Sequence, residues 1–125
     1  LNTPPVFAIY VCMLTLRWLK SKGGVEEMER LNNAKAALLY NEIDNNSLFK
    51  ATAAKEDRSK MNVCFVLNDK NLDETFFALA KEHNIVGIKG HRTTGGFRAS
   101  LYNALPISSV QVLVDVMKQF ALKYA

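Results

Sequence analysis

Residues 89–100 hold the side chains of this sequence that are best suited to binding anions. The segment reads Lys-Gly-His-Arg-Thr-Thr-Gly-Gly-Phe-Arg-Ala-Ser and lies between two apolar stretches. Arg92 and Arg98 carry planar guanidinium groups that match the oxygens of a carboxylate or a phosphate. His91 adds a third donor, whose charge changes near neutral pH. Because glycine also permits sharp turns that expose backbone N–H groups, the segment predicts an anion pocket.

Alternating residue types indicate that Arg98 lies on a strand. Successive side chains of a strand point to opposite faces, so the apolar residues share one face and the polar residues share the other. The two faces are Phe97, Ala99 and Leu101, and Arg98, Ser100 and Tyr102. A strand holds a binding side chain more firmly than a loop does. Composition alone slightly favours a plain surface hairpin, and both interpretations stay open at this point.

Hydrophobic periodicity predicts the elements that position this segment. An almost wholly apolar helix is expected over Val6 to Lys22, ended by Gly23 and Gly24 and capped by Asn2 or Thr3. Further helices are expected at 25–45, at 71–84 and from Ser108 or Ser109 onward. The last of these is expected to face inward with Val112, Val116 (or Leu113), Phe120 and Tyr124. Strands are expected at 48–52, 59–67, 85–89 and 97–103. This order predicts an α+β fold, with the helices on one face of a small, mainly antiparallel sheet.

The first predicted helix needs a neighbour that this domain can hardly supply. Residues 1–16 carry no charged side chain, include two prolines and form a stretch too short to span a membrane comfortably. A helix that is apolar nearly all round must be covered on several sides. We therefore expect another domain or subunit to pack against it.

Composition excludes several classes of protein. A chain of 125 residues, 49% hydrophobic and 22% charged, is an ordinary globular domain rather than a disordered one. The net charge of +4 comes without a dense run of Lys and Arg, so no nucleic-acid partner is expected. Cys12 and Cys64 lie far apart, with no nearby histidine at metal spacing. We expect no metal site and two reduced core thiols in a cytoplasmic protein.

Three collinear motifs resemble the phosphoserine aminotransferase family. They are residues 1–5, residues 58–63 and residues 89–106, and the resemblance covers essentially the whole chain. It implies the C-terminal small domain, residues 1–125, of a fold type I enzyme that uses pyridoxal 5'-phosphate. Residues 1–24 would be an inter-domain helix segment. The large cofactor-binding domain, with the lysine that holds the cofactor, is expected upstream, so this fragment alone is expected to be inactive and to bind no cofactor.

The resemblance also implies roles for individual residues. Arg98 matches the arginine that holds the substrate α-carboxylate, and His91 and Arg92 match residues that bind the distal phosphate or the side-chain carboxylate of glutamate. Asn2 and Thr3 match the pair that reaches the cofactor phosphate of the neighbouring subunit.

The activity implied by the resemblance is transfer of the amino group between glutamate and 3-phosphohydroxypyruvate by a homodimer. The product is O-phosphoserine in serine biosynthesis, and in many bacteria the same enzyme serves pyridoxal phosphate synthesis. This sequence differs from the residues usual in the family at Thr93, Thr94, Phe97 and Cys64, which leaves the substrate preference slightly open. The alternative is a free-standing regulatory module that binds a phosphorylated metabolite through its anion pocket.

Overall fold

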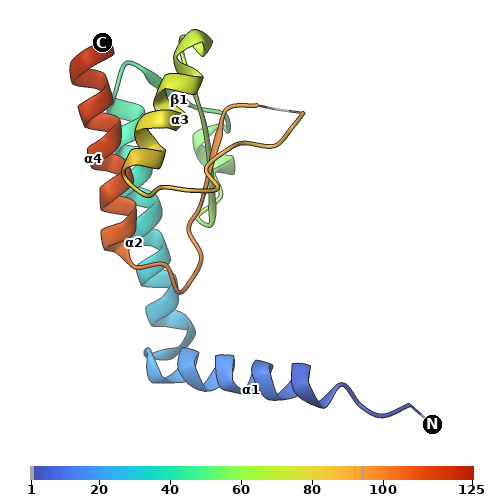
Figure 1. Ribbon diagram of the computed structural model, residues 1–125. Helices are drawn as coiled ribbons and strands as arrows, with labels where there is room; N and C mark the ends of the chain where they lie inside the picture. Colours follow the sequence, from blue (N-terminus) through green and yellow to red (C-terminus); the bar gives the residue numbers. More distant parts are fainter. Residues whose placement is uncertain (1, 94) are drawn as a thin grey trace. The chain divides into compact units, whose positions relative to one another are not determined.

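The computed structural model describes residues 2–93 and 95–125 (Figure 1). Leu1 and Thr94, which belong to the first and third motifs, lie outside the described residues. The chain divides into two units, residues 1–31 and residues 32–125, and each is described by itself. The first contains α1 (Val6–Ser21) and the start of α2 (Gly24–Asn45).

Helix α1 begins later than a cap at Asn2 or Thr3 predicts. Pro5 is the N-cap residue, with ψ of 71°, and no side chain caps the helix. Proline cannot donate a backbone hydrogen bond, and a residue that precedes proline is disfavoured from helical geometry. The Pro4–Pro5 pair therefore delays the helix to Val6. No residue of α1 is buried, and its exposed apolar residues include Val6, Phe7, Ile9, Tyr10, Val11, Leu14 and Leu16.

The second unit is built on a three-stranded antiparallel sheet in the order β1-β2-β3. The strands are β1 (Phe49–Ala51), β2 (Asn62–Leu67) and β3 (Phe97–Ser100). Phe49 pairs with Leu67 and Phe65 with Phe97, so the residues of the buried face are in register across the sheet. The predicted alternation is confirmed: Val63, Phe65 and Leu67 are buried on β2, as are Phe97 and Ala99 on β3.

The predicted strand at 85–89 is wrong. Only Lys89 makes an isolated bridge, to Phe97, although the N–H of Arg98 still donates to the oxygen of Ile88 at 2.8 Å. Gly87 has φ of +70°, a left-handed conformation that interrupts extended backbone. The segment therefore runs beside β3 without forming a full ladder.

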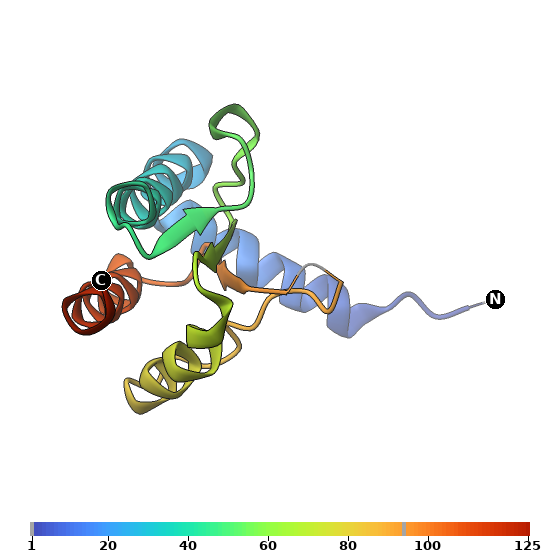
Figure 2. The same ribbon diagram turned by 90° about the horizontal axis from the view of Figure 1, so that it is seen from above.

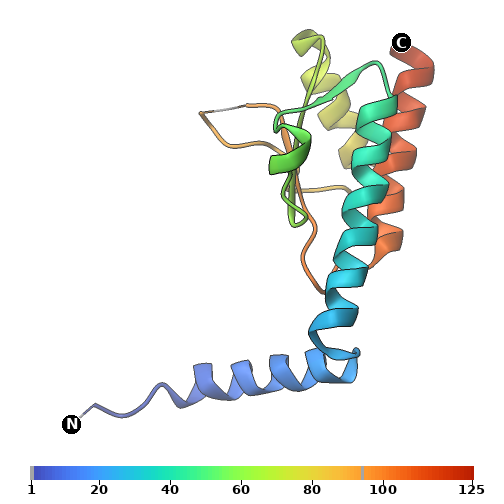
Figure 3. The same ribbon diagram turned by 180° about the vertical axis from the view of Figure 1, so that it is seen from behind.

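Helices cover one face of this sheet and confirm the α+β class. Helices α2, α3 (Asp73–Glu82) and α4 (Ile107–Tyr124) lie on the same side of the strands (Figures 2 and 3). Two short 3-10 helices, η1 (Lys55–Asp57) and η2 (Lys70–Leu72), occupy the connections. The core between the layers is rich in phenylalanine, and Phe76 lies at its centre, with other rings 5.1 to 6.5 Å away.

Helix α4 departs from the prediction at its start and on one face. It begins at Ile107, with Pro106 as the N-cap residue, rather than at Ser108 or Ser109. Val112 is 41% exposed, because the buried stripe runs through positions spaced by three and four residues on the opposite side. That stripe consists of Val110, Leu113, Val114, Val116, Met117 and Phe120.

An ion pair ties the β1–β2 connection to α2. The Arg58 guanidinium donates two hydrogen bonds to the Asp44 carboxylate, at 2.7 and 2.8 Å, and stacks 4.6 Å from the centre of the Tyr40 ring. The Tyr40 hydroxyl donates to the backbone oxygen of Ser59 at 3.0 Å. These contacts fix the chain just before β2 and hence the position at which that strand begins.

The stabilisation from Asp44 is expected to be lost in acid. The Arg58 hydrogen bonds lower the pKa of Asp44 below its ordinary value. A carboxylate with a lowered folded-state pKa stabilises the fold above its unfolded pKa of about 3.9 and loses this effect as pH falls through the folded value. Urea unfolding at several pH values should show that Asp44→Asn destabilises the chain at pH 7 and progressively less below about pH 4. Asp115→Asn, on α4 and without an arginine partner among the described residues, is the control.

Candidate anion-binding site

Arg98 projects from the sheet face that α2, α3 and α4 leave open. It is exposed, at the centre of β3, and pairs with Cys64 of β2. Within the residues that the structure describes, its guanidinium has no hydrogen bond or ion pair. Five N–H donors in a planar fork, carried on a strand with a fixed register, suit a carboxylate or a phosphate.

His91 and Arg92 lie in an exposed hairpin loop that leads into β3. The Lys89–Phe97 bridge closes the loop, and the N–H of Gly90 donates to the oxygen of Gly96 at 2.8 Å. The loop, drawn in orange in Figure 3, extends away from the sheet. Because one hairpin carries His91, Arg92 and Arg98, the structure brings these three predicted residues onto neighbouring backbone segments.

The His91 ring is oriented by its own loop. Its Nδ1 lies 2.8 Å from Oγ1 of Thr93 and accepts the Thr93 backbone N–H at 3.3 Å. Both contacts involve the same ring nitrogen and set the orientation of the ring within the loop.

Two glycines give the hairpin a backbone that other residues adopt only with strain. Gly95 and Gly96 have φ of +66° and +63°. A Cβ on Gly96 would lie 2.7 Å from Cγ1 of Val66 and 2.8 Å from the backbone oxygen of Phe65, whereas a Cβ on Gly95 would meet nothing within 4 Å. The close approach at Gly96 seats the returning side of the loop against β2.

Alanine substitutions should separate these two effects. Gly95→Ala should cost about 1–2 kcal/mol, the ordinary penalty of a left-handed residue. Gly96→Ala should cost clearly more, because its methyl group also clashes with β2. Thermal unfolding of both variants measures the difference, and equal losses would contradict the packing of Gly96.

Asn2 and Thr3 belong to the first unit. Both are exposed and precede α1, a helix whose first turn holds no acidic residue. The free N–H groups of a helix N-terminus favour anions, and an amide and a hydroxyl add further donors. This donor set fits a phosphate group, which is the chemistry expected of these two residues.

Sequence reasoning missed Asn62 as a neighbour of Arg98. Asn62 lies at the start of β2 and pairs with Ser100 of β3, and Oγ of Ser100 donates to its Oδ1 at 3.0 Å. The alternation of β2 places Asn62 on the polar face. Its position opposite Ser100 depends on strand register, which the sequence pattern alone does not fix.

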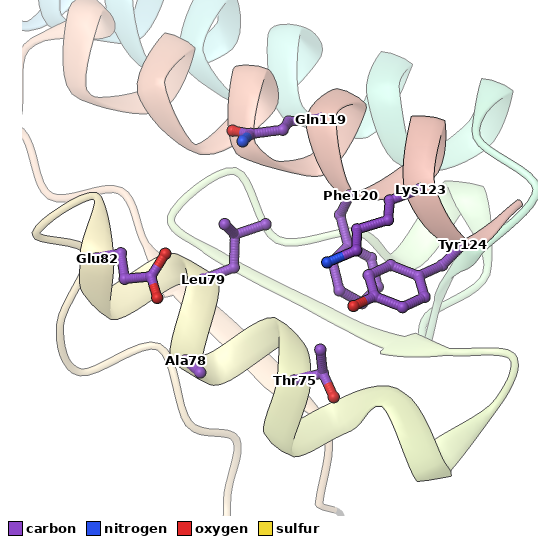
Figure 4. Close-up of a pocket in the computed structure, with 8 residues that line it drawn as sticks. All are labelled: Thr75, Ala78, Leu79, Glu82, Gln119, Phe120, Lys123 and Tyr124. Atoms are coloured by element: carbon purple, nitrogen blue, oxygen red, sulfur yellow. The ribbon is translucent and has the colours of Figure 1, made fainter.

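Two hollows in the second unit differ in their relation to this site. One, of about 480 Å³, is bordered by Arg98, Ser100, Tyr102 and the segment 84–88. The other, of about 350 Å³, lies between α3 and α4 and is lined by none of the predicted site residues (Figure 4). The hollow beside β3 is therefore the one adjacent to the candidate site.

Both cysteines are free, but neither is in the core as predicted. Cys12 is exposed on α1, and Cys64 is half-buried on the open face of the sheet. Cys64 lies between the buried residues Val63 and Phe65 on β2, and successive side chains of a strand point to opposite faces, so Cys64 is on the face opposite the core. In the part of the chain that the structure describes, no helix is long and apolar enough to cross a membrane, and no cluster of three or more His, Cys, Asp or Glu could hold a metal ion.

Comparison with known proteins identifies the family to which the chain belongs. The family model for class-V aminotransferases matches residues 1–113. The chain belongs to the class-V aminotransferase family.

Its relatives within that class are phosphoserine aminotransferases. The chain is 63% identical over 122 residues to the phosphoserine aminotransferase of Flavobacterium johnsoniae and 60% identical over 121 residues to that of Bacteroides thetaiotaomicron. These alignments cover 98% and 95% of the chain but 34% of each relative, so the chain spans about a third of the length of these relatives. This similarity disfavours the free-standing regulatory module.

Solved structures agree with the family assignment. The phosphoserine aminotransferase of Bacillus circulans subsp. alkalophilus aligns with a TM-score of 0.94 and 38% identity, over 99% of this chain and 35% of that one. The PLP-bound phosphoserine aminotransferase of Trichomonas vaginalis aligns with a TM-score of 0.86 and 40% identity, over 94% of this chain and 34% of that one.

Proposed function

We propose that this chain is the C-terminal part of a phosphoserine aminotransferase. The complete enzyme transfers the amino group between glutamate and 3-phosphohydroxypyruvate and forms O-phosphoserine. The observation that carries the proposal is the Arg98 guanidinium, which has no hydrogen bond or ion pair to any described residue and is held on a central position of β3, in a chain that resembles these enzymes along nearly its whole length.

Arg98 binds the substrate α-carboxylate in this proposal. Its fork forms two parallel N–H···O bonds with the carboxylate, which fixes the orientation of the adjacent carbon. Holding the reacting carbon in one geometry removes much of the entropic cost of the reaction. The strand, rather than a mobile loop, defines that geometry because β3 is paired along its length with β2.

His91 and Arg92 bind the group at the far end of the substrate. One substrate carries a phosphate there and the other a carboxylate, so the site must accept two anions of different shape. Arg92 provides a permanent charge, and the His91 ring adds a donor that gains charge when protonated. Both lie in a loop rather than on the strand, which allows the adjustment that two substrates require.

The cofactor of the proposed enzyme is pyridoxal 5'-phosphate. When bound, it draws electrons away from the carbon that exchanges the amino group. Asn2, Thr3 and the start of α1 offer donors that suit its phosphate, and we propose that they serve the neighbouring subunit of a homodimer. The lysine that holds the cofactor belongs to a large domain that precedes residue 1, and residues 1–24 link the two domains. The proposed enzyme acts in the cytoplasm.

Transaminase assays on two forms of the protein test the proposal. The complete gene product and the 125-residue chain are each assayed with glutamate, 3-phosphohydroxypyruvate and added pyridoxal phosphate. Activity in the complete product alone is the expected result and places the chemistry outside this chain. Inactivity of both forms, with the cofactor supplied, would overturn the proposed function.

A further inference from the structure

Asn62 is a diagonal neighbour of Arg98 on the open face of the sheet. Asn62 pairs with Ser100 and Cys64 pairs with Arg98, so Asn62 and Arg98 lie on adjacent strands two residues apart in register. Diagonal partners on one face are about 7–8 Å apart, within reach of long side chains. A ligand of a few atoms that contacts the Arg98 guanidinium therefore lies within reach of the Asn62 amide.

The Asn62 amide is held in one orientation. Its Oδ1 accepts the Ser100 hydroxyl at 3.0 Å. Its backbone N–H donates to Oγ of Ser59 at 3.0 Å, which fixes the main chain where β2 begins. The two Nδ2 hydrogens make no hydrogen bond within the described residues, and the side chain is exposed. Two donors are thus presented to solvent beside the Arg98 guanidinium.

The face around these two side chains favours negative ligands. The outward positions of the three strands carry cationic, neutral polar or apolar groups and no carboxylate. They are Lys50 on β1, Asn62, Cys64 and Val66 on β2, and Arg98 and Ser100 on β3. An anion bound at Arg98 therefore meets no repulsive charge from the strands beneath it.

We propose that Nδ2 of Asn62 is a second donor for the carboxylate that Arg98 binds, and that Ser100 is a positioning residue that orients the amide. The inference rests on the proposed function and extends it to the carboxylate of the amino- and 2-oxo-acid substrates. A carboxylate has about four lone-pair positions, of which a bidentate arginine uses two. Asn62 supplies an N–H to a position that Arg98 leaves open.

Substitutions at Asn62 in the complete enzyme test this role. Asn62→Ala should raise KM for glutamate about tenfold and change kcat less, because it removes one hydrogen bond to a charged group of the substrate. Asn62→Asp, of nearly the same shape, should raise KM further, since it places a negative charge beside the carboxylate. Asn45→Ala is the matched control, because that amide bonds within α2, to Asn41, and should leave both constants unchanged.

Two further variants separate binding from structural support. Ser100→Ala should raise KM less than Asn62→Ala does, and Ser100→Thr, which keeps the hydroxyl, should restore it. If Asn62 and Arg98 hold one carboxylate, their alanine substitutions should be non-additive in a double-mutant cycle. A defect that arises only from misfolding would instead lower the melting temperature without this coupling.

The outcomes distinguish this inference from the proposed function. An inactive wild type would overturn the proposed function itself. An active wild type that is impaired by Arg98→Ala but indifferent to both Asn62→Ala and Asn62→Asp would overturn the role of Asn62 alone. If Asn62→Ala does not fold, Asn62→Leu, which is close in size but has no N–H donor and no charge, decides the question.

Discussion

Arg98→Ala in the complete enzyme should lower kcat/KM about 10- to 150-fold, since it removes a charge-assisted contact worth about 1.5–3 kcal/mol. KM should rise because the α-carboxylate loses its partner, and kcat should fall because the reacting carbon is no longer held in place. The absorbance of bound cofactor should be unchanged, since the proposed cofactor contacts lie elsewhere in this chain, at Asn2 and Thr3.

Arg98→Lys separates charge from geometry. Lysine keeps the positive charge but cannot form the bidentate fork, so its activity should lie between those of the wild type and the alanine variant. Steady-state kinetics with varied glutamate measure both constants. Wild-type values of KM and kcat in Arg98→Ala would show that the arginine does not bind substrate.

Phe76→Ala should cause the largest loss of stability of any substitution considered for this chain, about 3–5 kcal/mol. The Phe76 side chain is fully buried, and its ring lies 5.1 Å from those of both Phe97 and Phe120. Alanine leaves a cavity between α3, α4 and the sheet that these neighbours can fill only in part. Urea unfolding of the 125-residue chain, monitored by circular dichroism, gives the change in free energy.

Phe7→Ala provides a chemically matched control. Phe7 is 80% exposed on α1, so its removal from the 125-residue chain should change the unfolding free energy by no more than about 0.5 kcal/mol. Equal losses for the two substitutions would contradict the position of Phe76 in the core. The comparison measures burial directly, because the same side chain is removed in both variants.

Local patterns predicted most of the second unit because hydrophobic periodicity reports which face of an element is buried. The alternation of Phe97 and Ala99 with Arg98 and Ser100 located β3 and placed the arginine away from the core. The same pattern failed at 85–89, where Gly87 adopts positive φ and the apolar run forms a bridge rather than a strand. Composition alone does not reveal which conformation a glycine adopts.

Sequence also predicted Arg98 but not Asn62. An arginine just after a pair of glycines, on an alternating strand, is a visible signal for anion binding, whereas an asparagine at the start of an apolar strand has several ordinary explanations. Asn62 and Arg98 are 36 positions apart along the chain (98 − 62). They lie close together only because the register between β2 and β3 brings them onto adjacent strands. Long-range pairing of this kind arises from packing as a whole.

The two faces of β3 have different surroundings, so residues on one face can be substituted with little effect on the other. Phe97 and Ala99 are fixed by the core, while Arg98 and Ser100 face away from it. Substitutions on one face are therefore expected to change the melting temperature and substitutions on the other to change ligand affinity. In a library that randomises all four positions, fitness effects should alternate with period two. Selection on one property would then leave the other nearly untouched, so this strand can acquire a new ligand preference without first losing its fold.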